Sequence, residues 1–231
     1  MARYQLGITP DWFKDIDTGF EFVSLIATFL IAATAYKFYK LTDEKRYKWF
    51  SVSFFIISLS YLFKILTNLV VYNEQWGTRT LGKFVYTVQY MHEYYYFEIV
   101  GTLVFRFLML LGLFGLYYLI CRCQDKKTIP IVVFLLILTT IFSNIQYFAF
   151  HLTAAVILSL IVYQYYQNYK AMKKKKMTFQ NPLIAFSVLL ISQLIFALLF
   201  LNPKVYVVAE IVQLVGFLLL LYNYIQLVRS T

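Results

Sequence analysis

Histidine and cysteine are scarce in this chain of 231 residues, which contains two of each. His92 and His151 lie far apart in the sequence, and Cys121 and Cys123 have no histidine near them. Zinc and haem sites need several such ligands, so the sequence predicts no metal site and no cofactor. Because alternate positions of a helix point in different directions, a disulfide between the two cysteines is not expected either.

The short motifs of common enzymes are also missing. The chain has no Gly-x-Ser-x-Gly elbow, no phosphate-binding P-loop and no paired acidic motif for phosphoryl or prenyl chemistry. The sequence therefore predicts a protein that is not an enzyme, with no catalytic residues.

Charged residues make up only 14% of the chain, whereas 61% of it is hydrophobic and 20% aromatic. No soluble domain of this length needs so much apolar surface. The apolar residues form seven runs, and about 20 helical residues cross a hydrocarbon core of roughly 30 Å. The sequence predicts an all-α membrane protein, a single seven-transmembrane-helix bundle, with spans at residues 19–39, 49–71, 98–121, 129–146, 148–168, 182–201 and 205–227.

Lysine and arginine are concentrated in every second connection between these runs. The connections after the first, third and fifth spans, together with the C-terminus, hold fourteen of them, and the opposite side holds five. The positive-inside rule then places the N-terminus outside and the C-terminus in the cytoplasm, in the plasma membrane. The net charge of +10 is this orientation signal, so no nucleic-acid partner is expected.

The densest basic run is Lys173, Lys174, Lys175 and Lys176. It is expected to lie against anionic lipid headgroups, and a docking site for a cytoplasmic protein partner is the alternative. On the opposite side, residues 72–97 form a long connection that is rich in tyrosine and has apolar residues at helical spacing. We expect an outer interfacial or capping helix there, with a lid over a binding cavity as the functional alternative.

Among the ionisable residues inside the predicted spans, where a charge costs roughly 2.5 to 3.5 kcal/mol on insertion scales, four stand out: Lys64, Glu98, Arg106 and Glu210. Asn68 follows the lysine of the second span by one helical turn, and Gln213 follows the glutamate of the seventh in the same way, so each pair shares a helix face. The candidate ligand-binding residues are therefore Lys64, Asn68, Glu98, Arg106, Glu210 and Gln213.

Two arrangements of these groups are open at this stage. In the first, Arg106 pairs with Glu210 and Lys64 with Glu98, as structural ion pairs that set helix register. In the second, Arg106 and Lys64 hold an anionic group of a ligand while the glutamates balance the charge. Some of the groups could instead reach lipid headgroups by snorkelling.

Three short matches between the two halves suggest an internal repeat of three helices, one joining helix and three helices. The matched segments are Tyr36–Tyr39 with Tyr163–Tyr166, Phe50–Val52 with Phe186–Val188, and Glu98–Val100 with Glu210–Val212. This 3+1+3 layout is similar to that of the SWEET sugar transporters, and the order of outer N-terminus and inner C-terminus resembles rhodopsins and G-protein-coupled receptors. Residues 205–227 lack the lysine that binds retinal in rhodopsins.

The segment from Val207 to Leu221 also resembles uncharacterised multi-pass membrane proteins of archaea, a likeness that implies no activity. The favoured function is a receptor-like sensor that binds a small polar or amphiphilic ligand in an outward-facing polar cavity. A SWEET-like facilitator of a small solute is the alternative, and a structural membrane subunit is the third. The expected partners are membrane lipids and the small ligand.

Overall fold

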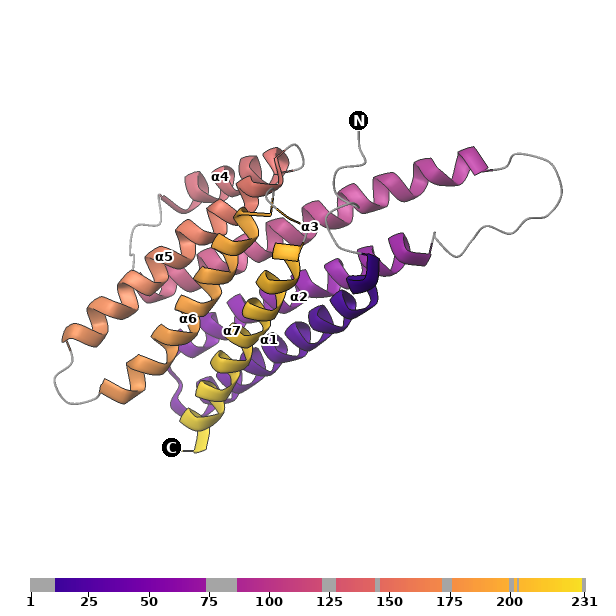
Figure 1. Ribbon diagram of the computed structural model, residues 1–231. Coiled ribbons are helices and arrows are strands. Elements are labelled where there is room, and N and C mark those ends of the chain that lie inside the picture. The colour runs from indigo at the N-terminus through magenta and orange to yellow at the C-terminus, as the bar shows by residue number, and fades with distance from the viewer. Residues whose placement is uncertain are drawn as a thin grey trace.

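The computed structural model describes residues 11–73, 87–121, 128–143, 146–171, 176–199, 202 and 204–229. These residues form helices only, and no strand occurs among them. Figure 1 shows the helices packed side by side. The odd-numbered helices begin at the end of the bundle where the N-terminus of the chain lies, and they run toward the opposite end. The elements are η1 (Asp11–Phe13), α1 (Lys14–Thr42), α2 (Lys45–Asn73), α3 (Thr87–Cys121), α4 (Thr128–Phe142), α5 (Tyr147–Ala171), α6 (Lys176–Ala197) and α7 (Lys204–Arg229).

Five of the seven helices are long and apolar enough to cross a membrane, namely Ile16–Thr42, Lys45–Val70, Tyr96–Cys121, Tyr147–Ala171 and Lys204–Gln226. The apolar parts of α4 and α6, Ile129–Phe142 and Pro182–Ala197, are shorter. The 15 residues of α4 rise about 22 Å, less than a hydrocarbon core. The chain is thus an integral membrane protein with several apolar helices. That all seven helices cross the membrane, and the side on which each terminus lies, are still predictions.

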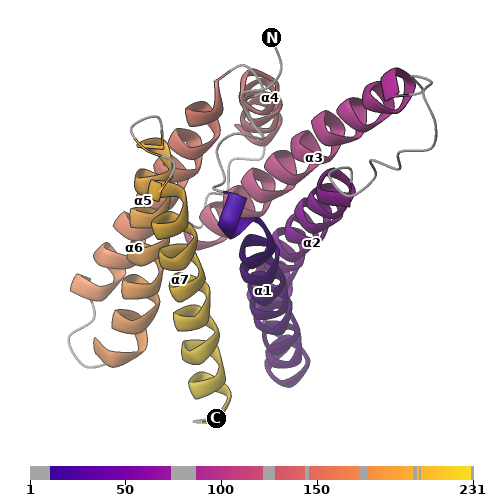
Figure 2. The same ribbon diagram turned by 45° about the vertical axis from the view of Figure 1, so that its right-hand side comes forward.

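The helices pack as two consecutive sets of three. In the first set α2 packs between α1 and α3, and in the second α6 packs between α5 and α7. The sets meet where α1 contacts α7 and where α3 contacts α5, while α4 packs against α3 and α5 (Figures 1 and 2). The contacts thus group the helices as three, one and three, whereas an internal repeat of the two sets stays a prediction.

The helix that the sequence predicted in the 72–97 connection is, over residues 87–97, the first part of α3. In both views this end of α3 extends beyond the neighbouring helices (Figures 1 and 2). Residues 74–86 and the lysines at 173–175 lie outside the described residues. The lid and the cytoplasmic docking site therefore stay predictions.

A tight turn joins α1 to α2 and helps to set their antiparallel packing. Asp43 adopts a left-handed conformation with φ 54°, and its backbone N–H donates a hydrogen bond to the carbonyl oxygen of Tyr39 at 2.8 Å. Aspartate tolerates this conformation better than most residues other than glycine. The turn therefore ends α1 and reverses the chain within two residues.

The core lies inside the ring of helices, and large apolar side chains also cover its outside. The main core includes Ile57 of α2, Leu110 of α3 and Phe186 of α6, each fully buried. On the outer surface Phe134 of α4 and Val156 of α5 are 58% and 60% exposed. Such apolar exposure on all sides fits a bundle that is solvated by lipid.

Close packing of α3 on α2 depends on Gly112. A Cβ atom at this position would lie 2.5 Å from Cγ1 of Ile57 and 3.0 Å from the carbonyl oxygen of Ser53. We expect Gly112→Ala to lower the free energy of unfolding by about 1–3 kcal/mol, because overpacking forces the two helices apart. Thermal unfolding in detergent measures this change.

Gly19 in α1 provides the matched control, because no atom lies within 4 Å of a Cβ added there. Gly19→Ala should leave the stability unchanged or raise it by about 0.5–1 kcal/mol, the helix-propensity difference. Equal stability of the two variants would contradict the close contact between α2 and α3.

Candidate functional site

A polar stripe runs along one face of α1. Asp17, Glu21, Ser24 and Thr28 follow one another at spacings of four, three and four residues, which places them on the same side of a helix. All four are buried, with exposures of 2% or less. The Thr28 hydroxyl donates a hydrogen bond to the Ser24 carbonyl oxygen at 2.8 Å. The stripe therefore points two carboxyl groups into the bundle.

Lys64 of α2 lies between carboxyl groups of two other helices. Its Nζ is 2.9 Å from Oε1 of Glu21 in α1 and 2.8 Å from Oε1 of Glu210 in α7. Both glutamates are buried, and the lysine side chain is 19% exposed. Buried charges keep their ionised form only when partners replace the lost water. One ammonium group thus joins α1, α2 and α7.

The Tyr206 hydroxyl connects Asp17 to the same group of residues. Its oxygen is 3.0 and 3.1 Å from the two carboxylate oxygens of Asp17 and 3.1 Å from Oε1 of Glu210. A tyrosine hydroxyl carries one hydrogen, so it can donate to only one of these carboxyl groups. The hydroxyl oxygen in turn accepts a hydrogen bond from Lys64 Nζ at 3.5 Å, so Tyr206 contacts the lysine as well as the two carboxyl groups.

Asn68 completes the group. Its side-chain nitrogen donates to both carboxylate oxygens of Glu21, at 2.8 and 2.9 Å. It lies one turn from Lys64 on the same face of α2. We call these six residues the carboxylate cluster: Asp17, Glu21, Lys64, Asn68, Tyr206 and Glu210.

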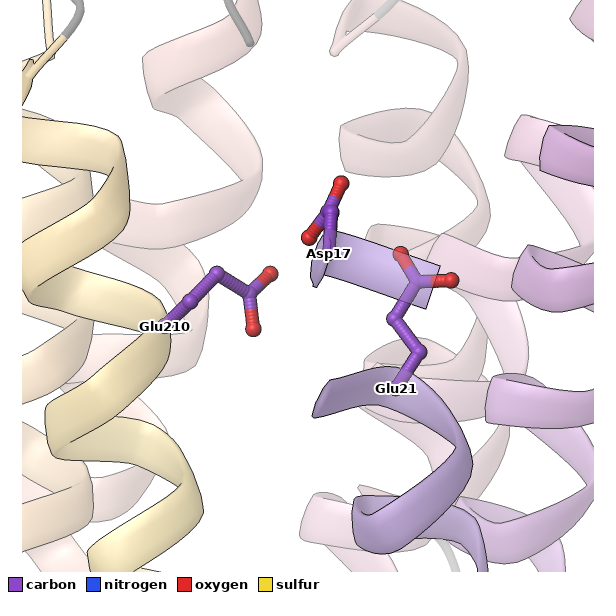
Figure 3. A group of neighbouring side chains, drawn as sticks. All are labelled: Asp17, Glu21 and Glu210. Carbon is purple, nitrogen blue, oxygen red and sulfur yellow. The ribbon is translucent and has the colours of Figure 1, made fainter. Parts of the chain in front are cut away.

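The carboxylate cluster has more negative than positive charge. Figure 3 shows the carboxyl groups of Asp17, Glu21 and Glu210 facing one another from α1 and α7, and one oxygen from each lies within 4.8 Å of the others. With all groups ionised, three carboxylates and one ammonium give a formal charge of −2. In a buried site such an excess strongly favours an added positive charge.

The structure brings together half of the residues that the sequence proposed as a site. Lys64, Asn68 and Glu210 meet in the carboxylate cluster. Gln213 is buried beside it in α7, and its side-chain nitrogen donates to the Tyr61 hydroxyl at 2.7 Å. Gln213 therefore supports a helix contact between α7 and α2.

Arg106 contacts other groups than those expected. Its Nη1 donates to the carbonyl oxygen and the hydroxyl of Ser143 at 2.7 and 2.9 Å, and its guanidinium lies over the rings of Tyr147 and Phe150. The expected pair of Arg106 with Glu210 is not formed, because Glu210 pairs with Lys64. Arg106 links α3 to the junction between α4 and α5.

Glu98 is half-buried near the start of the apolar part of α3. The sequence paired it with Lys64, but the ion pairs of Lys64 in the described part of the chain go to Glu21 and Glu210. The expected pair is wrong because the carboxyl groups of α1 and α7 contact the ammonium group, while α3 contributes the ring of Phe105 there.

Sequence reasoning missed Asp17, Glu21 and Tyr206. The two acidic residues lie at the edge of an apolar run, where polar residues are usually read as interfacial. The available signal was their spacing of four residues, continued by Ser24 and Thr28 in the same phase. No comparable signal marks Tyr206, because the chain contains 21 tyrosines.

The fold and this site define a helical integral membrane protein with a buried charged cluster. Comparison of the chain with protein-family models, with curated proteins and with solved structures gave no match. The likenesses to rhodopsins, to SWEET transporters and to archaeal membrane proteins thus have no support from these comparisons. The function is argued from the site.

Proposed function

We propose that this protein is a receptor-like membrane sensor, without enzymatic activity, that binds a small polar ligand carrying positive charge at the carboxylate cluster. The observation that carries the proposal is the charge excess of three buried carboxyl groups around one ammonium group. Electrostatic attraction is stronger in this low-dielectric environment than in water. Ionisable residues inside a membrane are costly to hold there, which makes them candidates for a functional role.

The contacts of Lys64 argue against the anionic ligand expected from the sequence. An anion would have to replace Glu21 and Glu210, which contact Nζ at 2.9 and 2.8 Å. It would also lie close to Asp17. A cationic group is instead attracted electrostatically by all three carboxyl groups. The ring of Phe105, whose centroid is 5.5 Å from Nζ, is an apolar neighbour for the rest of an amphiphilic ligand.

The test is thermal stabilisation of the protein in lipid nanodiscs by ethylammonium, with acetate as the anionic comparison. Binding to the folded state alone raises the free energy of unfolding by about 2.7 kcal/mol at a ligand concentration of 100 Kd. We expect ethylammonium to stabilise the wild type, and Glu210→Gln to reduce this effect. The exposed Glu44→Gln is the control and should respond like the wild type. Stabilisation by acetate but not by ethylammonium would contradict the proposal.

A SWEET-like facilitator is the second candidate, and the helix packing favours it. The carboxylate cluster takes Asp17, Glu21, Lys64 and Asn68 from the first set of three helices, and Tyr206 and Glu210 from the second. Transporters built from two repeats hold their substrate between them. A facilitator would carry radiolabelled methylammonium into proteoliposomes, whereas a sensor binds it without flux.

A further inference from the structure

His151 is the only buried side chain in the described part of the chain with a polar atom that has no hydrogen-bond partner there. The side chain is 5% exposed and lies near the start of α5. Its Nδ1 is 2.8 Å from Oε1 of Gln193 in α6, whereas Nε2 has no partner. A buried polar atom left in this way costs about 1–3 kcal/mol. The atom therefore needs an explanation.

The contact with Gln193 determines which nitrogen carries the hydrogen. As the amide is oriented, its carbonyl oxygen faces Nδ1, so Nδ1 donates and Nε2 has a free lone pair. The neutral ring can then accept one hydrogen bond at Nε2. A group that meets it must donate an O–H or N–H.

Aromatic rings surround the imidazole. The ring of Phe196 stacks on it with centroids 4.7 Å apart, and the rings of Tyr147 and Phe150 lie at 4.7 and 4.8 Å. Apolar walls with one or two well-placed polar atoms are typical of small-molecule sites. The surroundings favour a ligand whose body is apolar and whose polar group is a single donor.

This region is separate from the carboxylate cluster. Phe196 packs edge-on against the Tyr206 ring, with centroids 5.6 Å apart, so these two rings stand between His151 and the carboxyl groups. The guanidinium of Arg106 lies over two of the rings that contact His151, 5.4 Å from the centroid of Tyr147 and 5.9 Å from that of Phe150. A positive charge so near disfavours a cationic ligand, and an ionised carboxylate lacks the hydrogen that Nε2 accepts. The ligand that fits is uncharged.

We propose that His151 Nε2 is the polar contact of a second binding site, which accepts a hydrogen bond from the hydroxyl of an uncharged, mainly apolar alcohol or phenol. Gln193 positions the imidazole, and the rings of Tyr147, Phe150 and Phe196 contact the apolar body. The site does not depend on the carboxylate cluster, and it stands or falls independently of the function proposed above.

The experiment is nitrogen NMR of the protein labelled with ¹⁵N-histidine in nanodiscs, using benzyl alcohol as probe and toluene as its match without a hydroxyl. His92→Gln leaves His151 as the only labelled side chain, because the chain has two histidines. We expect benzyl alcohol to move the Nε2 resonance saturably toward that of a hydrogen-bonded nitrogen, and toluene to leave it in place. Equal responses, no response, or a hydrogen already on Nε2 would overturn the proposal.

A pair of glutamine variants tests the positioning role. Gln193→Leu removes the partner of Nδ1, and we expect the apparent affinity for benzyl alcohol to fall about tenfold, as for one lost hydrogen bond. Gln226→Leu changes an exposed glutamine at the far end of α7 and should bind like the wild type. Equal affinities of the two variants would show that Gln193 does not orient the ring. If Gln193→Leu does not fold, the response of the His151 Nε2 resonance to benzyl alcohol and toluene tests the proposed site by itself.

Discussion

Replacing Lys64 by methionine is expected to lower the free energy of unfolding by about 3–5 kcal/mol, the usual result of removing one partner of a buried ion pair. The lysine is the only cation within the carboxylate cluster, and it contacts Glu21 and Glu210 at 2.9 and 2.8 Å. Methionine keeps much of the apolar stem but leaves three carboxyl groups close together. Their repulsion and lost hydration both destabilise the packing of α1, α2 and α7.

Thermal unfolding in nanodiscs measures this loss, with Lys37→Met as the control. Lys37 is exposed on α1, so its replacement should change stability by no more than about 0.5 kcal/mol. Adding Glu21→Gln and Glu210→Gln to the Lys64→Met variant should restore part of the stability, because no ionised glutamate then lacks its partner. If Lys64→Met unfolds like Lys37→Met, the cluster does not hold the helices together.

Replacing Arg106 by leucine should lower the free energy of unfolding by about 3 kcal/mol, since hydrogen bonds to charged groups contribute about 1.5–3 kcal/mol and a buried carbonyl loses its donor. The arginine is 2% exposed, and its Nη1 donates to both the carbonyl oxygen and the hydroxyl of Ser143. Ser143 directly follows α4, which packs mainly against α3 and α5. The loss should therefore be greatest in α4.

Hydrogen exchange followed by mass spectrometry localises this effect. In Arg106→Leu the amides of α4 should exchange faster than in the wild type, whereas those of α1 should change little. Arg46→Leu removes an exposed arginine near the start of α2 and serves as the control. Arg106→Lys should recover part of the protection, because an ammonium group can still reach one oxygen of Ser143. Unchanged exchange in α4 would refute the anchoring role.

Much of the fold could be predicted from apolar runs alone. Each of the seven runs overlaps one helix, and five of these helices are long enough to span a membrane. The prediction was less accurate at the ends. Residues 129–146 were expected as one span, but α4 ends at Phe142, and the sixth run was expected to reach 201, but α6 ends at Ala197. Apolar residues continue past Ala197, and the predicted fourth span included the polar residues Ser143 and Gln146, so hydropathy alone did not locate either helix end.

The candidate site could be predicted only in part. Polar residues in apolar runs indicated Lys64 and Glu210, and helical spacing added Asn68, and the structure brings these three residues together, whereas their role in binding stays a prediction. The same reasoning grouped Arg106 with them, although its hydrogen bonds go to Ser143. The depth of a polar residue along its helix indicated which residues lie at the same level of the bundle. Depth alone does not say which helices are neighbours.

The sequence by itself determined that this chain forms apolar helices in a membrane, because a segment in lipid must satisfy its backbone hydrogen bonds internally. Only the tertiary structure decided that α7 packs on α1, and hence that Lys64 lies between Glu21 and Glu210. That choice depends on contacts between residues far apart in the sequence, such as the hydroxyl of Tyr206 in α7 against the carboxylate of Asp17 in α1. No local pattern encodes it.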